Sequence, residues 1–129
     1  MISAPQLLSI LRVGHDTSMS GEGVGLREAI VRSNYEHLRP NFGPADLLPL
    51  VEADHSLIEE WAAYSRDKRT SGGWYLDDLK IGQLNSPGVV VFPSTAEAVA
   101  NYVVCELDFW VSVRAAGKPD VQAPKGEPT

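Results

Sequence analysis

Hydrophobic residues recur at helical spacing in several separate stretches of the first half of the chain. Apolar side chains cluster in residues 4–13 and recur near the 3.6-residue helical period in residues 26–38. A third stretch follows Pro44 and predicts a short helix that abuts a longer one beginning near Asp54. Between the first two stretches, residues 14–25 contain four glycines and few apolar side chains, which predicts a flexible loop.

The pattern changes in residues 74–92, where short apolar runs alternate with turn residues. Such runs predict two or three strands in a meander of hairpins. Asp77 and Asp78 could form a carboxylate pair beside Trp74 and Tyr75, but adjacent residues on a strand point to opposite faces. We therefore interpret the two aspartates as part of a turn.

Residues 94–116 give the clearest helical pattern in the chain. Ser94 followed by Glu97 is typical of a capping box, and the apolar residues after it keep the helical period. Proline and charged residues dominate residues 118–129, which predicts a disordered tail after a single globular domain over residues 1–117. The expected fold class is α+β: about four helices with a small antiparallel sheet of two or three strands, and the C-terminal helix packed on the sheet.

Length and composition limit the class of protein. A chain of 129 residues with 43% hydrophobic and 22% charged residues is typical of one globular core. It has neither an apolar run long enough to span a bilayer nor the pattern of a secretory signal, so we expect a cytoplasmic protein without membrane contact. The formal net charge of -6 disfavours nucleic acid as a partner.

The negative charge is unevenly distributed. Residues 43–65 contain no lysine or arginine but five acids: Asp46, Glu52, Asp54, Glu59 and Glu60. Such a block has two interpretations. It is either the solvated face of a helix or a surface whose electric field steers a basic protein partner.

No motif predicts a metal, a cofactor or a catalytic residue. The three histidines are far apart in sequence and fall on separate elements: His15, His37 and His55. Only His55 and Glu59 share a helix face, and two ligands do not make a metal site. The G-x-G-x-G sequence of residues 21–25 lacks the lysine of a phosphate-binding loop. Acidic neighbours disfavour a reactive thiolate at Cys105.

Aromatic and basic residues are grouped around the Ser-Gly-Gly sequence at residues 71–73. Arginine, tryptophan and tyrosine are frequent interface anchors, which makes this junction a candidate site. The alternative is a helix cap followed by a core tryptophan. Together with the acidic block, the junction supplies the predicted binding residues: Asp54, Glu59, Glu60, Tyr64, Arg66, Arg69, Trp74 and Tyr75.

These patterns favour a small acidic, non-catalytic protein-binding module. In size and charge alone it is comparable to immunity or antitoxin proteins, which bind a basic partner by complementary charge. The alternative is an enzyme or small-ligand-binding domain with a pocket of scattered residues: His55, Glu59, Arg66, Arg69 and Tyr75. A homo-oligomer is a further alternative, because Val104 and Phe109 lie off the main apolar stripe of the last helix.

Overall fold

A computed structural model of the protein describes residues 2–17, 25–67, 73–84 and 86–117. Helices occupy most of this part of the chain, and three strands form one antiparallel sheet on which the last helix packs. The α+β class is therefore confirmed. In chain order the elements are α1 (Ala4–Leu11), α2 (Val13–Thr17), α3 (Leu26–Arg32), α4 (Tyr35–Leu38), the 3-10 helix η1 (Arg39–Asn41), α5 (Pro44–Ala53), α6 (Ser56–Asp67), β1 (Trp74–Asp77), β2 (Lys80–Gln83), β3 (Val89–Val91) and α7 (Thr95–Gly117).

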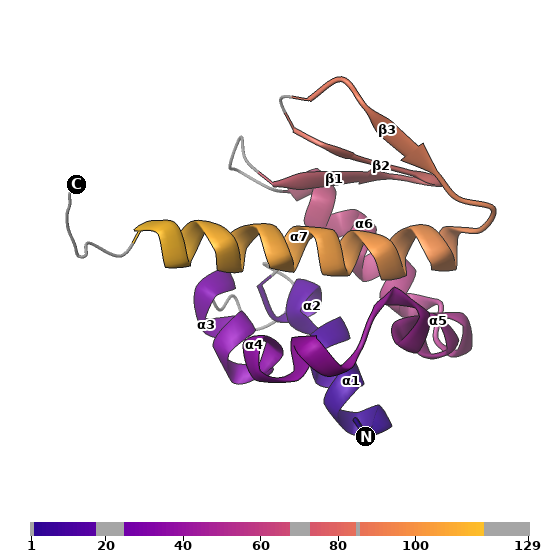
Figure 1. Cartoon of the computed structure of the whole chain (residues 1–129). Coiled ribbons are helices and arrows are strands. Elements are labelled where there is room, and N and C mark those ends of the chain that lie inside the picture. Colours follow the sequence, from indigo (N-terminus) through magenta and orange to yellow (C-terminus); the bar gives the residue numbers. More distant parts are fainter. Residues whose placement is uncertain (1, 18–24, 68–72, 85, 118–129) are drawn as a thin grey trace.

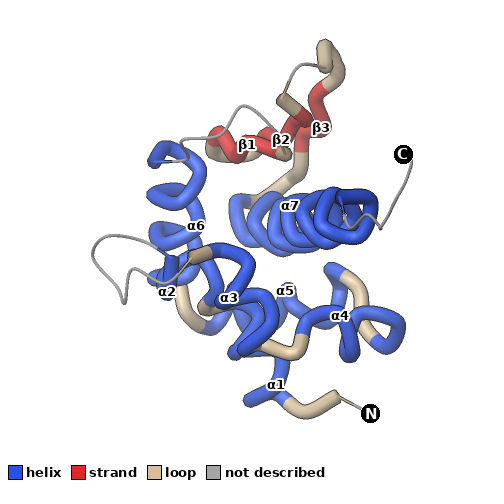
Figure 2. Tube along the Cα trace, turned by 90° about the vertical axis from the view of Figure 1, so that its left-hand side faces the viewer, coloured by secondary structure: helices blue, strands red, loops and turns tan. Residues whose placement is uncertain are grey.

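Helix α7 runs through the middle of the molecule. The sheet covers one side of it, and α1 to α5 lie on the opposite side (Figure 1). Viewed along α7, helix α6 stands beside it and reaches toward β1 (Figure 2). The last helix is thus enclosed between the N-terminal helices and the sheet.

The enclosure of α7 follows from its composition. All residues at 98–100 and 102–104 are buried, and only Asn101 between them is partly exposed. Buried positions therefore surround the helix instead of forming one stripe. The Ser94 cap is confirmed at the helix start, where the Glu97 amide donates a hydrogen bond of 3.2 Å to the Ser94 hydroxyl. Val104 is also buried inside the chain, which removes it as a basis for self-association.

The predicted loop over residues 14–25 is wrong at its beginning, because α2 continues to Thr17. Gly14 is buried there, and a Cβ atom at this position would lie only 2.9 Å from Cδ2 of Trp61. The indole itself is fully buried, and its Nε1 donates to the Leu11 carbonyl at 2.7 Å. The absence of a side chain at Gly14 therefore allows the Trp61 ring to pack closely against the backbone, a contact that the local sequence does not reveal. Residues 18–24 and 118–129 lie outside the described residues.

Residues 26–38 form two helices instead of the one predicted. Asn34 adopts a left-handed conformation with φ 62°, which asparagine tolerates better than most residues. Before it, the buried Ser33 hydroxyl donates to the Ile30 carbonyl at 2.7 Å and caps the end of α3. The break turns Tyr35 and Leu38 into the core.

The α5–α6 pair matches the prediction of a shorter helix that abuts a longer one. Pro44 occupies the first turn of α5, where its missing amide costs nothing. Asp54 lies in the turn before α6, and its Oδ1 accepts hydrogen bonds from the Ser56 amide at 3.1 Å and hydroxyl at 2.6 Å. These bonds lower the pKa of the Asp54 carboxyl, as expected for a helix-capping acid.

The sheet has the strand order β1-β2-β3, and both pairs are antiparallel. Asp78 has a φ of 57° in the turn between β1 and β2, so the interpretation of the aspartates as a turn is confirmed. Ile81 pairs with Leu76 on one side and Val90 on the other, and this row faces α7. Within the described part of the chain, no helix is long and apolar enough to cross a membrane.

The two-sided burial of α7 gives a matched test on one helix. Val103 is fully buried, whereas Val113 is 44% exposed. Val103→Ala should lower the free energy of unfolding by about 2 kcal/mol, because it removes buried methyl groups and leaves a cavity. Val113→Ala should change it by less than about 0.5 kcal/mol. Urea denaturation of both variants checks this, and equal effects would contradict the central position of α7.

Candidate functional site

The acidic block falls on α5, α6 and the turn between them. Glu52 and Glu59 are exposed, and no cation in the described part of the chain forms an ion pair with either. The other three acids take part in the fold. Asp46 accepts a hydrogen bond of 2.9 Å from the Gly43 amide, Asp54 caps α6, and Glu60 lies 3.6 Å from Nδ1 of His15.

The predicted junction is divided between interior and surface. Tyr64 is buried, and Trp74 is half-buried at the start of β1. Arg66 is exposed at the end of α6, and Arg69 lies outside the described residues. Tyr75 lies on the outer face of the sheet, across Gly82, where an added Cβ would collide with the tyrosine ring. The aromatic part of the junction thus packs on the molecule itself.

A buried carboxylate explains why Tyr64 and Trp74 come together. Glu106 of α7 is 0% exposed. Its Oε2 accepts hydrogen bonds from the Tyr64 hydroxyl at 2.7 Å and from Nε1 of Trp110 at 2.9 Å. Its Oε1 accepts one from the Trp74 amide at 2.7 Å. Glu106 therefore ties α6 and β1 to α7, which fits the rule that buried polar groups are hydrogen-bonded.

Sequence reasoning missed Glu106 as a structural centre and considered it only as a neighbour of Cys105. The available signal was its position one turn after Tyr102 and next to Leu107, among apolar residues of the last helix. Cys105 itself is half-buried, and burial, followed by the charge of Asp108, raises the pKa of its thiol. This agrees with the expectation that acidic neighbours disfavour a reactive thiolate.

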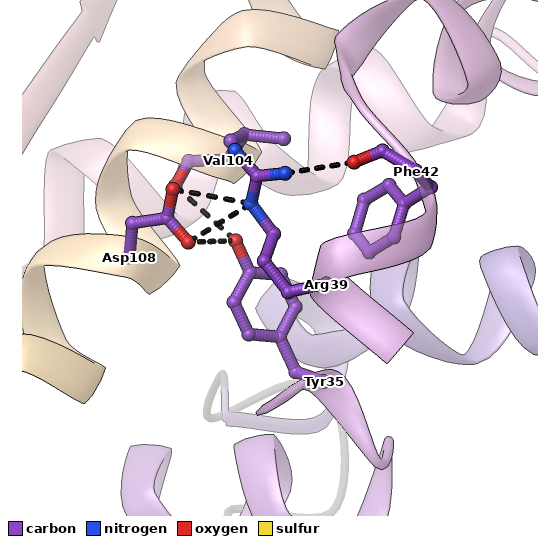
Figure 3. A network of polar contacts seen from close by, with 5 residues as sticks. All are labelled: Tyr35, Arg39, Phe42, Val104 and Asp108. Atoms are coloured by element: carbon purple, nitrogen blue, oxygen red, sulfur yellow. Dashed lines mark hydrogen bonds and ion pairs between the residues drawn. The ribbon is translucent and has the colours of Figure 1, made fainter. Parts of the chain in front are cut away.

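A second polar network lies on the opposite side of α7 (Figure 3). Asp108 Oδ1 accepts a hydrogen bond of 2.6 Å from the buried Tyr35 hydroxyl. Nε of Arg39 lies 3.1 Å and 3.2 Å from the two carboxylate oxygens, and its NH1 donates to the Phe42 carbonyl at 2.7 Å. The guanidinium also lies over the Phe42 ring, 5.5 Å from its centre. This network joins α4 and η1 to α7.

Of the residues of the alternative pocket, His55 and Arg66 lie at opposite ends of α6, and Arg69 lies outside the described residues. His55 precedes the first turn of α6 and Arg66 lies in its last turn, about 16 Å away at the rise of an α-helix. Tyr75 lies on the sheet. Among the residues that the structure describes, no group of three or more histidine, cysteine, aspartate or glutamate side chains is placed to hold a metal ion.

Comparisons with protein-family models, with curated proteins and with solved structures found no match to this chain. The chain's own side chains and exposed surfaces are therefore the only basis for inferring its function.

The Glu106 network predicts a specific loss of stability. Glu106→Gln keeps the side-chain shape but replaces one acceptor oxygen by an amide nitrogen, so at least one of the three donors loses its partner. We expect a decrease of about 2 to 3 kcal/mol in the free energy of unfolding. Glu97→Gln, the same change at a half-buried position of α7, should cost less than about 0.5 kcal/mol. Chemical denaturation of the two variants checks this, and a neutral Glu106→Gln would remove the network's structural role.

The buried tyrosines predict instability at alkaline pH. Burial raises the pKa of Tyr35, Tyr64 and Tyr102 far above the ordinary value, and Asp108 or Glu106 adds to the increase. Because each tyrosine binds its proton more tightly when folded, this stabilisation is complete below about pH 10 and is lost as the pH rises further.

We therefore expect the tyrosinate absorbance of these three residues to appear only together with unfolding in an alkaline titration. Far-ultraviolet circular dichroism recorded on the same samples reports the unfolding. The chain in denaturant is the control, and its tyrosines should ionise near pH 10. Ionisation of the three buried residues while the dichroism stays native would show that they are accessible to solvent, contrary to the structure.

Proposed function

We infer that the protein is a small acidic, non-catalytic protein-binding module, and that α5 and α6 carry its surface for a basic protein partner. The observation that supports this most directly is that the side chains of Glu52 and Glu59 are exposed and form no ion pair within the described chain. Acids with no structural partner leave a local negative field, which accelerates encounter with a positively charged surface.

Two other exposed acids on the described surface provide a contrast, because each lies near a cation. Glu28 lies 3.9 Å from Arg32 on α3, and Asp77 lies 3.8 Å from Lys80 at the first hairpin. Their charges are partly neutralised by these neighbours, although such exposed pairs add little stability. Glu52 and Glu59 both belong to the α5–α6 corner, within a stretch of sequence that contains no lysine or arginine.

The buried polar groups support binding over catalysis. Tyr64 donates to the buried Glu106, and the buried Tyr35 donates to Asp108, and these contacts between elements fix the packing of α7. A small-ligand site needs polar groups that converge on a pocket, and the described residues of the alternative pocket are spread along α6 and onto the sheet. We therefore place the function on the surface.

A pair of charge reversals tests this function. Glu52→Lys/Glu59→Lys should abolish salt-sensitive capture of a basic protein from host lysate at low salt, with at least a tenfold loss of the retained partner (~1.4 kcal/mol or more). Glu28→Lys/Asp77→Lys changes the net charge equally at compensated positions and should retain the partner. Mass spectrometry of the captured proteins provides the measurement.

Equal capture by both double variants would overturn the proposed surface. Capture that is lost equally in both would show that only net charge matters, and this too would contradict a specific site on α5 and α6. Thermal unfolding of each variant in parallel separates loss of binding from loss of fold.

A further inference from the structure

The two edge strands of the sheet, β1 and β3, differ in how their outward backbone groups are hydrogen-bonded. At the β1 edge, side chains bond to the backbone amides that point away from β2. The Trp74 amide donates to Glu106, and the Leu76 amide donates to Ser65 Oγ at 2.8 Å. The Trp74 carbonyl accepts a hydrogen bond of 3.1 Å from the Tyr102 hydroxyl. Helices α6 and α7 therefore close this edge with their side chains.

Within the described residues, no side chain bonds to the opposite edge, that of β3. The Phe92 amide donates to the Leu79 carbonyl at 2.8 Å. Two residues before Phe92 on β3, Val90 pairs with Ile81, which lies two residues after Leu79 on β2. In an antiparallel ladder, bonded pairs alternate with pairs whose backbone groups point away. The N–H and C=O groups of Val89 and Val91 therefore point outward from the edge. Figure 2 shows β3 on the side of the sheet far from α6.

The side chains of this edge are apolar and exposed. Val89, Val90 and Val91 are 51%, 48% and 63% exposed, and they form an uninterrupted run of large exposed hydrophobic residues. Proteins commonly protect an edge strand with charged side chains, and β3 has none. On the outer face, Val89 lies next to Gly82 and the Tyr75 ring that crosses it, so the apolar surface extends across the sheet.

We propose that β3 pairs antiparallel with β3 of a second copy of this chain, about a two-fold axis at Val90, to form a continuous six-stranded sheet. In this register Val89 of each copy lies opposite Val91 of the other, and both pairs bring their outward N–H and C=O groups together. Backbone groups that are left without a strand partner in one copy thus become bonded in the dimer.

The sequence around β3 fits a second copy as the occupant. Residues 88–92 contain no charge, so symmetric pairing opposes no like charges, even though each chain has a net charge of -6. Pro87 and Pro93 flank this segment at equal distance from Val90. The two-fold axis places Pro87 of each copy opposite Pro93 of the other. Neither proline has the backbone N–H that would extend the ladder. The self-complementary segment therefore has a defined length and register.

Val91→Pro tests the ladder. The substitution removes a backbone N–H that does not hydrogen-bond to β2. The strand can therefore remain in its own sheet while pairing between copies is blocked. Sedimentation velocity over a range of concentrations should show the wild type at twice the mass of one chain. The dissociation constant should rise at least tenfold in Val91→Pro, whereas Val91→Thr, which keeps the amide and the branched side chain, should still dimerise.

A cysteine cross-link tests the register without weakening the interface. In a Cys105→Ser background, Val90→Cys should form an intermolecular disulfide, because the axis brings the two copies of residue 90 into a close non-hydrogen-bonded pair. Val113→Cys, at an exposed position of α7, should not cross-link at the same rate. This readout remains informative if Val91→Pro fails to fold.

Three outcomes would overturn the proposal. These are a wild type that stays monomeric, a dimer that Val91→Pro does not weaken, and equal cross-linking at positions 90 and 113. A monomeric chain that instead binds an extended peptide of another protein along β3 would show that the edge serves a different occupant. Charge reversal at Glu52 and Glu59 should leave the dimer intact, so failure of the dimer and failure of the proposed function are distinguishable.

Discussion

The structure depends on burying α7 from two sides at once. Its middle carries buried side chains around the whole circumference, so neither the sheet nor the N-terminal helices alone could cover it. Two carboxylates then fix its rotation. Glu106 and Asp108 are two residues apart, hence about 200° apart around the helix, and they bond to opposite layers. Each layer holds α7 through a buried tyrosine, so sliding or turning the helix would break both networks together.

This arrangement also explains the unequal edges of the sheet. Helix α7 supplies Glu106 and Tyr102 to the β1 edge, and α6 supplies Ser65. Helix α6 lies beside β1 (Figure 2), and α7 contacts β1 and β2. Within the described part of the chain, neither helix hydrogen-bonds to the outward backbone groups of β3. The polar bonds that secure α7 therefore leave the valine strand as an exposed border of the fold.

Local signals in the sequence predicted much of this fold. Ser94 and Glu97 marked the start of α7, Asp54 marked the turn before α6, and short apolar runs between turn residues marked the three strands. Interactions distant in sequence caused the errors. Residues 14–17 of the predicted loop are helical where Gly14 packs on Trp61, and the left-handed Asn34 divides one predicted helix into two. Proximity in sequence linked Tyr64 with Trp74, but only the fold shows that Glu106 joins them in the interior.

The two proposed surfaces differ in physical character, and salt should act on them differently. Attraction between Glu52, Glu59 and a basic partner is screened as ionic strength rises, so that association weakens. Two copies that each carry a net charge of -6 repel one another, and the same screening reduces this repulsion while apolar contact and backbone hydrogen bonds persist. A single chain therefore combines a surface that favours low salt with one that tolerates high salt. The two surfaces lie on different elements, so occupation of one does not require the other to be vacant.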